Sequence, residues 1–465
     1  MSLNRRSFLV GAGSGLSLLV LTACVPEPPR PTGSATGSPS PSAPVPRPSG
    51  IQRSDWSADP FARGAQSYLK PGATPQHRDD LAQPINGRVF FAGEATSPDL
   101  AGTVLGAQQS GARVAAELLG VAAVGEKIAV IGAGAAGAEA ARALLRAGFD
   151  VIVLEARARV GGRIDTRSPA SWPLAVESGA WRLGEGVDVS LLTRLASLGI
   201  ETSPLAGLLA AGVGGRVTTN PVGAPAFATA KSWAESQPVD PSLASALDRS
   251  GAKATAARAA ADGLAGADLL DASLASLAGI TGASAPELST WYGLSGPPAP
   301  DRIVTGGFSG LVTDALDGVR VSLSTAVLGV SHSDSAVSLK LGTGESLTVD
   351  RVAVTVPLGV LKTDALTFDP LLPFAHRTAI AALGMGAVET VWLRFDKPFW
   401  STDAALWSLV GSGGDLTDWV NLQAVTGEPV LVAIVGGRAA RRVAKLSDDE
   451  LVEAALSALA PFAAA

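Results

Sequence analysis

The chain contains a single cysteine, Cys24, among its 465 residues. A lone cysteine excludes a disulfide within the chain and any metal cluster built from several thiolates. Histidine is almost as scarce, because only His77, His332 and His376 are present and they lack the spacing of metal ligands. We expect each histidine on the surface or in a loop, and we expect no metal site.

Charged residues are also sparse, at 17% of the chain, and the formal net charge is −6. Without a basic surplus or a run of Lys and Arg, nucleic acid is not an expected partner. No arrangement of nucleophile, base and carboxylate indicates a hydrolase. The 53 glycines and many alanines are typical of an enzyme of helices, strands and tight turns, and the length suits two intertwined cores.

Residues 1–23 predict an export signal. A short polar region with Arg5 and Arg6 precedes a moderately apolar run at 8–23. This run is shorter than the roughly 20 residues that cross a bilayer, so a signal peptide is favoured over a membrane span. "NRRSFLV" resembles the twin-arginine export motif and "LTAC" resembles the lipobox, which implies lipidation of Cys24. The alternative is an amphipathic start with a chance pair of arginines.

The next segment, residues 24–50, is rich in Pro, Ser and Gly and has almost no large apolar side chain after Val25. This composition predicts a solvated, fairly extended linker. We expect it to hold a folded body off the outer face of the cell membrane, with the lipid anchor as the membrane contact. One acyl chain binds a membrane weakly, so stable anchoring would need several chains.

A strand, turn, helix and second strand follow one another from Gly125. "KIAVIG" is an apolar, β-rich run, and "GAGAAG" follows it with Gly132, Gly134 and Gly137 in the GxGxxG spacing. These glycines allow the tight turn, the approach of backbone amides to a pyrophosphate and the close packing of the next helix. The second strand, "FDVIVLE", ends in Glu155, whose carboxylate can accept both ribose hydroxyls of an adenosine. The pattern predicts a dinucleotide site.

The next segment, "ARARVGGRI", distinguishes an FAD-binding site from an NAD-binding site. It places the guanidinium groups of Arg159 and Arg163 beside the bare backbone of Gly161 and Gly162, near a second phosphate and a ring system. This Arg-Gly-Gly-Arg tail resembles the flavin amine oxidase superfamily. The resemblance implies an FAD cofactor, with Arg157 among its contacts.

The same resemblance implies an α/β fold, in which a Rossmann-like, doubly wound FAD-binding domain is interleaved with an α+β substrate domain. Cys24 lies in the signal region, so a cysteinyl–flavin bond of the monoamine oxidase type is impossible. We therefore expect FAD to be bound non-covalently.

More than a hundred residues precede the glycine motif, and they resemble the end of the family rather than its beginning. "RVFFAGEATSPDLAGTVLGAQQSGARVAAELLG" predicts a buried strand, an acid on a turn at Gly93 and Glu94, and a helix that starts near Thr103 and Val104. In the family, this acid holds the ribityl group and this helix points at the isoalloxazine. The chain ends with "LSDDELVEAALSALAPF", which resembles the helix that normally precedes this block. The order indicates a circular permutant; a misassembled reading frame is the alternative.

The resemblance covers nearly everything from about Ser54 onward. It implies an FAD-binding domain in residues 51–120, 125–205 and 301–363, a helical substrate domain in 206–300, and a substrate-domain sheet with a closing helix in 364–465. Further flavin-proximal residues are implied at Gly179, Ala180 and Trp181, and the backbone of Val327 is expected to meet adenine.

The implied reaction removes a hydride from the carbon beside an amine to the flavin, followed by imine hydrolysis and reoxidation by O2 to H2O2. Two features depart from the family. Thr390 stands where members commonly carry a water-holding Lys, and Gln66 stands where they often have Tyr. Trp56 and Trp392 are candidate walls of the substrate site, although each also suits a place in the core.

Other functions stay open at this point. The chain is either an oxidase of small amines, or a different FAD oxidoreductase acting on amino acids or carbon–carbon bonds, or an exported flavoprotein that binds ligand with little turnover because of Thr390. The expected partners of the first reading are a small-molecule amine and O2.

Overall fold

The computed structural model describes residues 45–184, 189–295 and 300–463. The predicted signal at 1–23, the lipidation site Cys24 and most of the predicted linker lie outside these ranges. Within them, no helix combines the length and the apolarity needed to cross a membrane.

A five-stranded parallel sheet carries the glycine motif on its central strand. Its order is β15 (Arg320–Ser322), β5 (Asp150–Leu154), β4 (Lys127–Ile131), β19 (Arg351–Val354) and β3 (Val89–Phe91). The inner strands are apolar and almost fully buried, as in parallel sheets that are covered on both faces. Strand β3 precedes the motif in the sequence, yet it pairs with β19 so that Phe90 lies opposite Ala353.

Each face of this sheet is covered by a different layer. Helices α2 (Val104–Val121), α3 (Ala135–Arg146) and α9 (Ser309–Ala315) pack on one face. The other face packs against a four-stranded sheet of β18 (Ser346–Val349), β17 (Val337–Leu341), β16 (Val327–His332) and β20 (Thr367–Asp369). The two cores fix the carboxyl ends of the parallel strands, the edge at which open α/β sheets bind their ligands.

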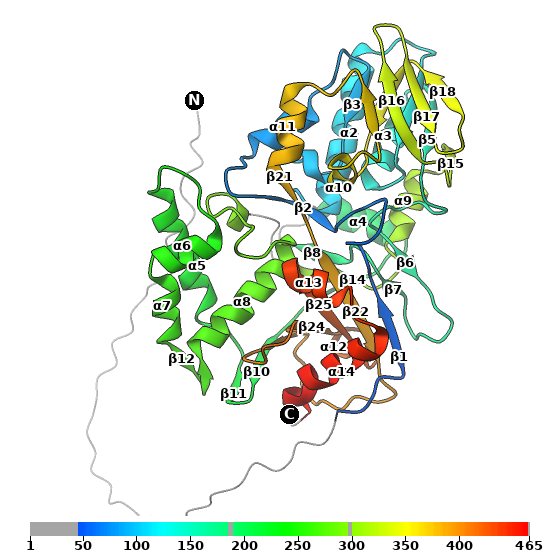
Figure 1. Cartoon of the computed structure of the whole chain (residues 1–465). Coiled ribbons are helices and arrows are strands. Elements are labelled where there is room, and N and C mark those ends of the chain that lie inside the picture. The colour runs from blue at the N-terminus through cyan, green and yellow to red at the C-terminus, as the bar shows by residue number, and fades with distance from the viewer. Residues whose placement is uncertain (1–44, 185–188, 296–299, 464–465) are drawn as a thin grey trace, which may run out of the picture. The chain divides into compact units, whose positions relative to one another are not determined.

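A seven-stranded mixed sheet forms the other main part of the fold (Figure 1). Its order is β1 (Gly50–Arg53), β22 (Val388–Arg394), β25 (Val430–Gly436), β24 (Asp418–Asn421), β23 (Leu406–Leu409), β10 (Leu208–Gly212) and β11 (Gly215–Val217). One face packs on α13 (Gly437–Val443) and α14 (Asp448–Leu459), and the opposite, inner face packs against Trp181. Four further helices lie beside this sheet: α5 (Gly223–Glu235), α6 (Leu243–Arg249), α7 (Ala252–Ala257) and α8 (Gly266–Thr281).

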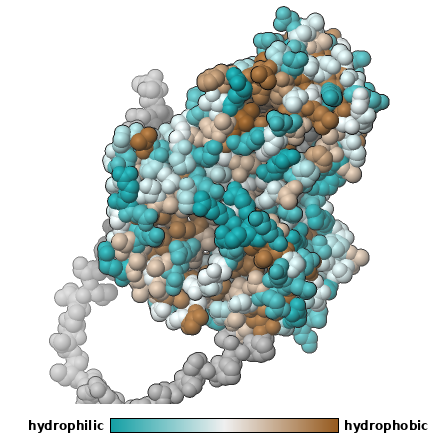
Figure 2. Space-filling model, in the orientation of Figure 1, coloured by the Kyte–Doolittle hydropathy of each residue, from teal (hydrophilic) through white to brown (hydrophobic). Residues whose placement is uncertain are grey.

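The outer surface over α13 is strongly hydrophilic (Figure 2). Its arginines have nearby partners, since Arg441 pairs with Glu287 at 3.2 Å and Arg442 pairs with Asp415. Such exposed pairs contribute little to stability, but they neutralise the basic charge of this surface.

The last part of the predicted linker, residues 45–50, lies against the folded body, although Pro46, Arg47 and Ser49 stay exposed. The amide of Ser49 donates to the carbonyl of Arg394 over 2.7 Å, and Val45 packs in the core beneath α14. An edge strand pairs through backbone groups alone, so a Pro- and Ser-rich composition does not prevent it.

Three predicted domain boundaries also differ from the structure. Strand β1 opens the predicted FAD-binding segment 51–120, yet it belongs to the seven-stranded sheet. Strands β10 and β11 extend the same sheet from within the predicted helical segment 206–300, and β20 in segment 364–465 pairs with β16 instead. In each case the partner strand is distant in the sequence, because tertiary packing, not local sequence, decides which sheet a short strand joins.

His376 was expected on the surface or in a loop, and this prediction is wrong. It lies in α11 (Phe374–Ala382), which packs on α1 (Gln76–Ala82), and its ring is 4.9 Å from that of Phe91. Its Nε2 lies 2.9 Å from the carbonyl oxygen of Gln83. Burial lowers the pKa of this imidazole, which therefore serves as a neutral core residue.

Candidate active site

One cavity of about 420 Å³ runs between the two main sheets. Along the parallel sheet it is lined by residues just after the strand ends, namely Gly93 after β3, Gly132 after β4, Glu155 after β5 and Thr355 after β19. At its other end it reaches Val388 and Thr390 on β22. A ligand in this cavity would therefore touch both sheets.

The turn after β4 has the shape of a phosphate cradle. Gly132 adopts φ +107°, and a Cβ there would lie 2.8 Å from Thr355 Oγ1, which itself donates to the carbonyl of Ile131 over 2.8 Å. Gly137 contacts the turn so closely that a Cβ would lie 1.9 Å from the Gly132 carbonyl oxygen.

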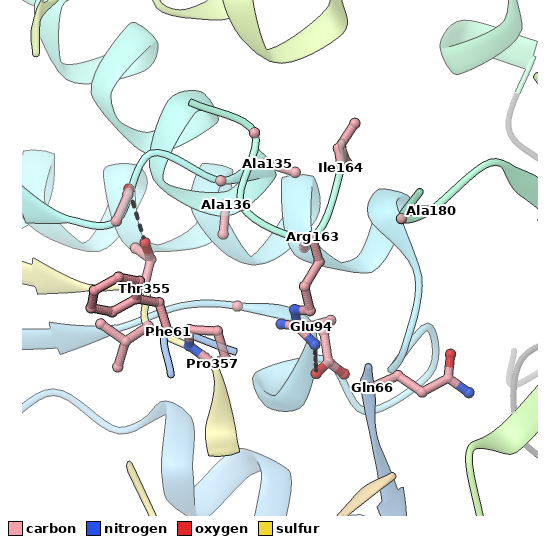
Figure 3. A pocket seen from close by; sticks show the side chains of 18 of the residues that line it. Phe61, Gln66, Glu94, Ala135, Ala136, Arg163, Ile164, Ala180, Thr355 and Pro357 are labelled. Atoms are coloured by element: carbon pink, nitrogen blue, oxygen red, sulfur yellow. Dashed lines mark hydrogen bonds and ion pairs between the residues drawn. The ribbon is translucent and has the colours of Figure 1, made fainter. Parts of the chain in front are cut away.

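Helix α3 begins immediately after this turn. Within the described residues no side chain caps its first amides, and its first residues Ala135 and Ala136 line the cavity (Figure 3). An uncapped helix start with bare backbone around it is suited to bind a pyrophosphate.

Glu155 lines the cavity directly after β5. Its carboxylate accepts from the amides of Ala133 and Arg157, each over 2.8 Å. These two bonds hold the carboxylate in place and leave further acceptor positions for the hydroxyls of a ribose. Arg157 is held in turn by a bidentate ion pair with Asp59, with both contacts at 2.8 Å.

Glu94 lies near the middle of the cavity. It accepts from Ser67 Oγ at 2.6 Å, from the amide of Gly102 at 2.8 Å and from Arg163 at 2.9 Å (Figure 3). Burial opposes its charge, but Arg163 and Arg78 outweigh burial and hold the pKa of Glu94 below its usual value. Glu94 is therefore an ionised acceptor that faces the cavity.

Two further features line the same cavity. Gly161 and Gly134 form a bridge between their backbones, so the Arg-Gly-Gly-Arg tail lies directly against the phosphate turn. Thr103 caps α2 by accepting from the amide of Gly106 over 2.9 Å, and Thr103 and Val104 both line the cavity.

The far end of the cavity is mostly apolar. Trp56 and Trp181 line it, and Trp56 is fixed by an indole hydrogen bond to the carbonyl of Ser178 over 2.8 Å. Gln66 lines it too and donates to the carbonyl of Ile280. Thr390 faces the cavity from β22, buried to 5% exposure.

Most of the predicted site residues line this one cavity. The predicted cofactor residues that do so are Gly93, Glu94, Thr103, Val104, Gly132, Gly134, Glu155, Arg157, Gly161, Gly162, Arg163, Gly179, Ala180, Trp181 and Val327, joined by Trp56, Gln66 and Thr390.

Three predicted site residues lie elsewhere. Arg159 turns away to Asp165, which it contacts at 3.1 Å. Trp392 lies in the core behind Trp181, with the ring centroids 5.2 Å apart, and Gly137 serves packing beneath the turn. Arg159 has a buried carboxylate within reach. Alternation along β22 gives Trp392 the same face as Thr390, but Trp392 packs against Trp181 in the core instead of lining the cavity.

The sequence analysis also missed residues that line the cavity. Thr355 follows a buried strand and Phe61 lies in a loop, and neither position carries a motif. Arg182 directly follows Trp181, so its place beside a predicted flavin-proximal turn was the available signal.

The residues present suit a dinucleotide with a ring system at one end. The phosphate turn leaves no space for a Cβ, Glu155 and Glu94 lie at separate points along one cavity, and the apolar end lies against β22.

The profile described as "Flavin containing amine oxidoreductase" matches residues 38–119 and 135–464. The chain belongs to this family. It is accordingly an amine-acting oxidoreductase with a flavin cofactor.

Similar proteins agree with this assignment. Polyamine oxidase 4 of Oryza sativa subsp. japonica is 29% identical over 355 residues, covering 71% of this chain and 72% of the relative. Lysine-specific histone demethylase 1 homolog 2 of the same organism is 29% identical over 357 residues, covering 69% of this chain and 44% of the relative.

Solved structures of the family share the fold. Wild-type putrescine oxidase bound to putrescine has a TM-score of 0.57 at 20% identity, covering 73% of this chain and 82% of that chain. Cyclohexylamine oxidase from Brevibacterium oxydans IH-35A has a TM-score of 0.58 at 20% identity, covering 73% and 83%. This mixed α/β fold is the one predicted for the family.

Proposed function

We propose that the chain is an FAD-dependent oxidase of small amines that hydrolyses the resulting imine and releases H2O2. The observation that carries this proposal is the single cavity that joins the phosphate turn of the parallel sheet to the apolar chamber at β22. When bound there, FAD accepts the hydride of the amine α-carbon and passes the electrons to O2.

In this proposal, each part of FAD has a partner along the cavity. The amides at the start of α3 would bind the pyrophosphate, Glu155 the adenosine ribose and Glu94 the ribityl chain, with the start of α2 toward the ring. Binding is non-covalent in this proposal, because Cys24 lies in the predicted signal.

The amine end of the cavity orients a neutral amine. Trp56 and Trp181 exclude bulk water and provide flat walls. Thr390 offers a hydroxyl that accepts from the indole of Trp392 at 3.3 Å and can hold a water, but it supplies no positive charge.

Replacing Thr390 with lysine tests the role of that position. We expect Thr390→Lys to speed the reaction of the reduced protein with O2, because an ammonium group near the developing negative charge stabilises it. Photoreduced protein mixed with O2 in a stopped-flow instrument measures this rate without any amine. Thr390→Met, of similar length and uncharged, is the control. Equal rates in native protein and Thr390→Lys would contradict the role assigned to this position.

A second substrate class is favoured by Arg182. Arg182 lines the cavity beside Trp181, and its guanidinium would repel the second ammonium of a diamine and attract a carboxylate. This observation supports amines that also carry a carboxylate, which are amino acids.

An anaerobic substrate panel tests these alternatives. The oxidised holoprotein is mixed with monoamines, diamines, polyamines and amino acids, and flavin bleaching is followed at its visible absorption band. Bleaching by an amine or an amino acid supports the oxidase and assigns its class. If none of the compounds bleaches the flavin, the chain is a ligand-binding flavoprotein and the oxidase proposal fails.

We also propose that the chain is a circular permutant of its family. Two observations support this: β3 and α2 precede the glycine motif yet pack with it, and the ends of the folded part lie side by side, where Arg47 pairs with Glu453 of α14. A rearranged chain in which residues 45–121 follow residue 463 should fold with the same flavin spectrum. A rearranged chain that does not fold would contradict the proposal.

For localisation, we propose export by the twin-arginine route and lipid anchoring at Cys24 on the outer face of the cell membrane. The sequence pattern of residues 1–24 supports this proposal. Cys24→Ala should move the protein from the membrane fraction to the soluble fraction, whereas membrane retention would contradict lipid anchoring.

A further inference from the structure

Four strands of the seven-stranded sheet share one transverse row of residues. Thr390 on β22 pairs with Ile434 on β25, Ile434 pairs with Asp418 on β24, and Asp418 pairs with Ser408 on β23. Residues directly opposite one another in antiparallel strands present their side chains on the same face. Asp418 therefore lies on the inner face that carries Thr390, two strand spacings away, or roughly 10 Å.

Arg182 reaches this row from the three-stranded sheet of β8 (Arg182–Gly184), β14 (Pro300–Val304) and β9 (Thr202–Pro204). Its guanidinium donates to the carbonyl of Gly279 over 2.8 Å. Gly279 lies against the row, since a Cβ there would be 3.4 Å from Ile434 Cγ2. Arg182 thus connects the wall of the cavity with the part of the row that contains Asp418.

The two charges affect each other without forming a close ion pair. Burial lowers the pKa of Arg182 to about 10, and Asp418 opposes this shift, so the guanidinium stays cationic at neutral pH. Burial raises the pKa of Asp418 to about 6, against hydrogen bonds from Ser276 and Ser408 and the charge of Arg182. Ser408 Oγ donates to Asp418 Oδ1 over 3.1 Å.

The surroundings of Asp418 contain few other charges. The neighbouring strands present Ser408 and Ile434 to it, and α8 presents Ser276 and Gly279. Among the described groups that face Asp418, Arg182 is the charged one. The carboxylate of Asp418 therefore interacts electrostatically mainly with this guanidinium.

We propose that Asp418 is a specificity-determining residue that competes with a substrate carboxylate for Arg182. With Asp418 ionised, the pair is neutral overall and binds a carboxylate weakly; with Asp418 protonated, the guanidinium is free to bind one. This inference rests on the proposed role of Arg182 in holding the carboxylate of an amino acid.

The direction of the pH effect follows from linkage. A bound carboxylate disfavours the ionised form of Asp418, so binding takes up a proton at pH values above about 6. Affinity for a carboxylate therefore rises as the pH falls toward about 6 and levels off below it, while affinity for a neutral ligand without a carboxylate stays constant.

Benzoate is a suitable probe, because it carries a carboxylate and cannot be oxidised as an amine. Its dissociation constant is measured on the holoprotein from the shift of the flavin spectrum at pH 5.0 and pH 7.5. We expect the native protein to bind benzoate about tenfold more tightly at the lower pH. Asp418→Asn should bind it equally tightly at both pH values, about tenfold more tightly than native protein at pH 7.5.

Two further variants complete the test. Arg182→Gln should lose benzoate binding at both pH values, and Asp396→Asn, an exposed carboxylate away from the cavity, should behave like native protein. A gain of affinity in Asp418→Asn cannot arise from damage to the fold, and the pH series of native protein provides the test if that variant does not fold.

The outcomes separate this inference from the proposed oxidase. Benzoate affinity that is independent of pH, or unchanged in Asp418→Asn, overturns the role of Asp418 even where amines bleach the flavin. Absence of benzoate binding in native protein overturns the carboxylate site at Arg182, again without affecting the amine oxidase. Bleaching is judged separately, from the anaerobic panel.

Discussion

Gly111→Leu is expected to yield protein that does not retain flavin. Gly111 lies on the face of α2 that crosses α3, and a Cβ there would be 2.1 Å from the carbonyl oxygen of Ala136. Ala136 belongs to the first turn of α3, the turn that lines the cavity. Because this contact is with backbone, a larger side chain must displace the start of α3, at a cost of about 3 kcal/mol in the free energy of unfolding.

The measurement is the ratio of flavin absorbance to protein absorbance after purification, together with the melting temperature. Gly120→Ala is the control, since it lies on the same helix and, apart from its chain neighbours and the nearby backbone of that helix, its new methyl group would meet no described atom within 4 Å. We expect the control to keep its flavin and to gain slightly in stability, because alanine favours the helix. Full flavin content in Gly111→Leu would mean that α2 and α3 do not jointly form the cradle.

Glu389→Gln is expected to loosen the loop that carries Trp56. Glu389 is 1% exposed, and its carboxylate accepts four hydrogen bonds, from Ser54 Oγ at 2.6 Å, from the amide of Trp56 at 3.0 Å, and from the amide and hydroxyl of Ser57 at 2.9 and 2.8 Å. All four groups are donors, and each carboxylate oxygen accepts from two of them. In glutamine an NH2 group replaces one of these oxygens, so it would face two donors without an acceptor. We expect a loss of about 2 kcal/mol in the free energy of unfolding.

The loop continues along the cavity, so its loosening should affect substrate binding. Trp56 lines the apolar end of the cavity, and Arg63 at the other end of the loop is exposed. We expect KM for the best substrate of the panel to rise about tenfold with a smaller change in kcat, and trypsin to cut after Arg63 faster than in native protein.

Asp55→Asn provides the control for this change. It makes the same exchange of carboxylate for amide in the same loop, at an exposed side chain, and should leave KM and trypsin cleavage as in native protein. If Glu389→Gln matches this control in both measurements, Glu389 does not position Trp56.

The dinucleotide site was predictable from sequence because it depends on local order. A β-rich run, glycines at 132, 134 and 137, and a carboxylate at the end of the next strand lie within one short segment, and each residue type has a backbone reason to be there. The structure places Gly132, Gly134 and Glu155 at the carboxyl edge of one sheet, as this order predicts.

Residues whose roles depend on distant partners were harder to predict. Arg159 and Arg163 have equivalent positions in the motif, yet Arg159 forms an ion pair with Asp165 and Arg163 forms one with Glu94. Asp418 lies in no motif, and its place beside Ser408 and Ile434 follows from the pairing of three strands. Neither outcome is contained in local sequence.

By itself, the sequence determined the cofactor class, the position of the glycine turn and the two carboxylates, Glu94 and Glu155, that line the cavity, because these follow from short-range backbone requirements. Only the tertiary structure decided which side chains face the cavity and which strands complete each sheet. The physical reason is that edge pairing and burial are decided by surfaces that meet from distant parts of the chain, as β1 with β22 and β3 with β19 show.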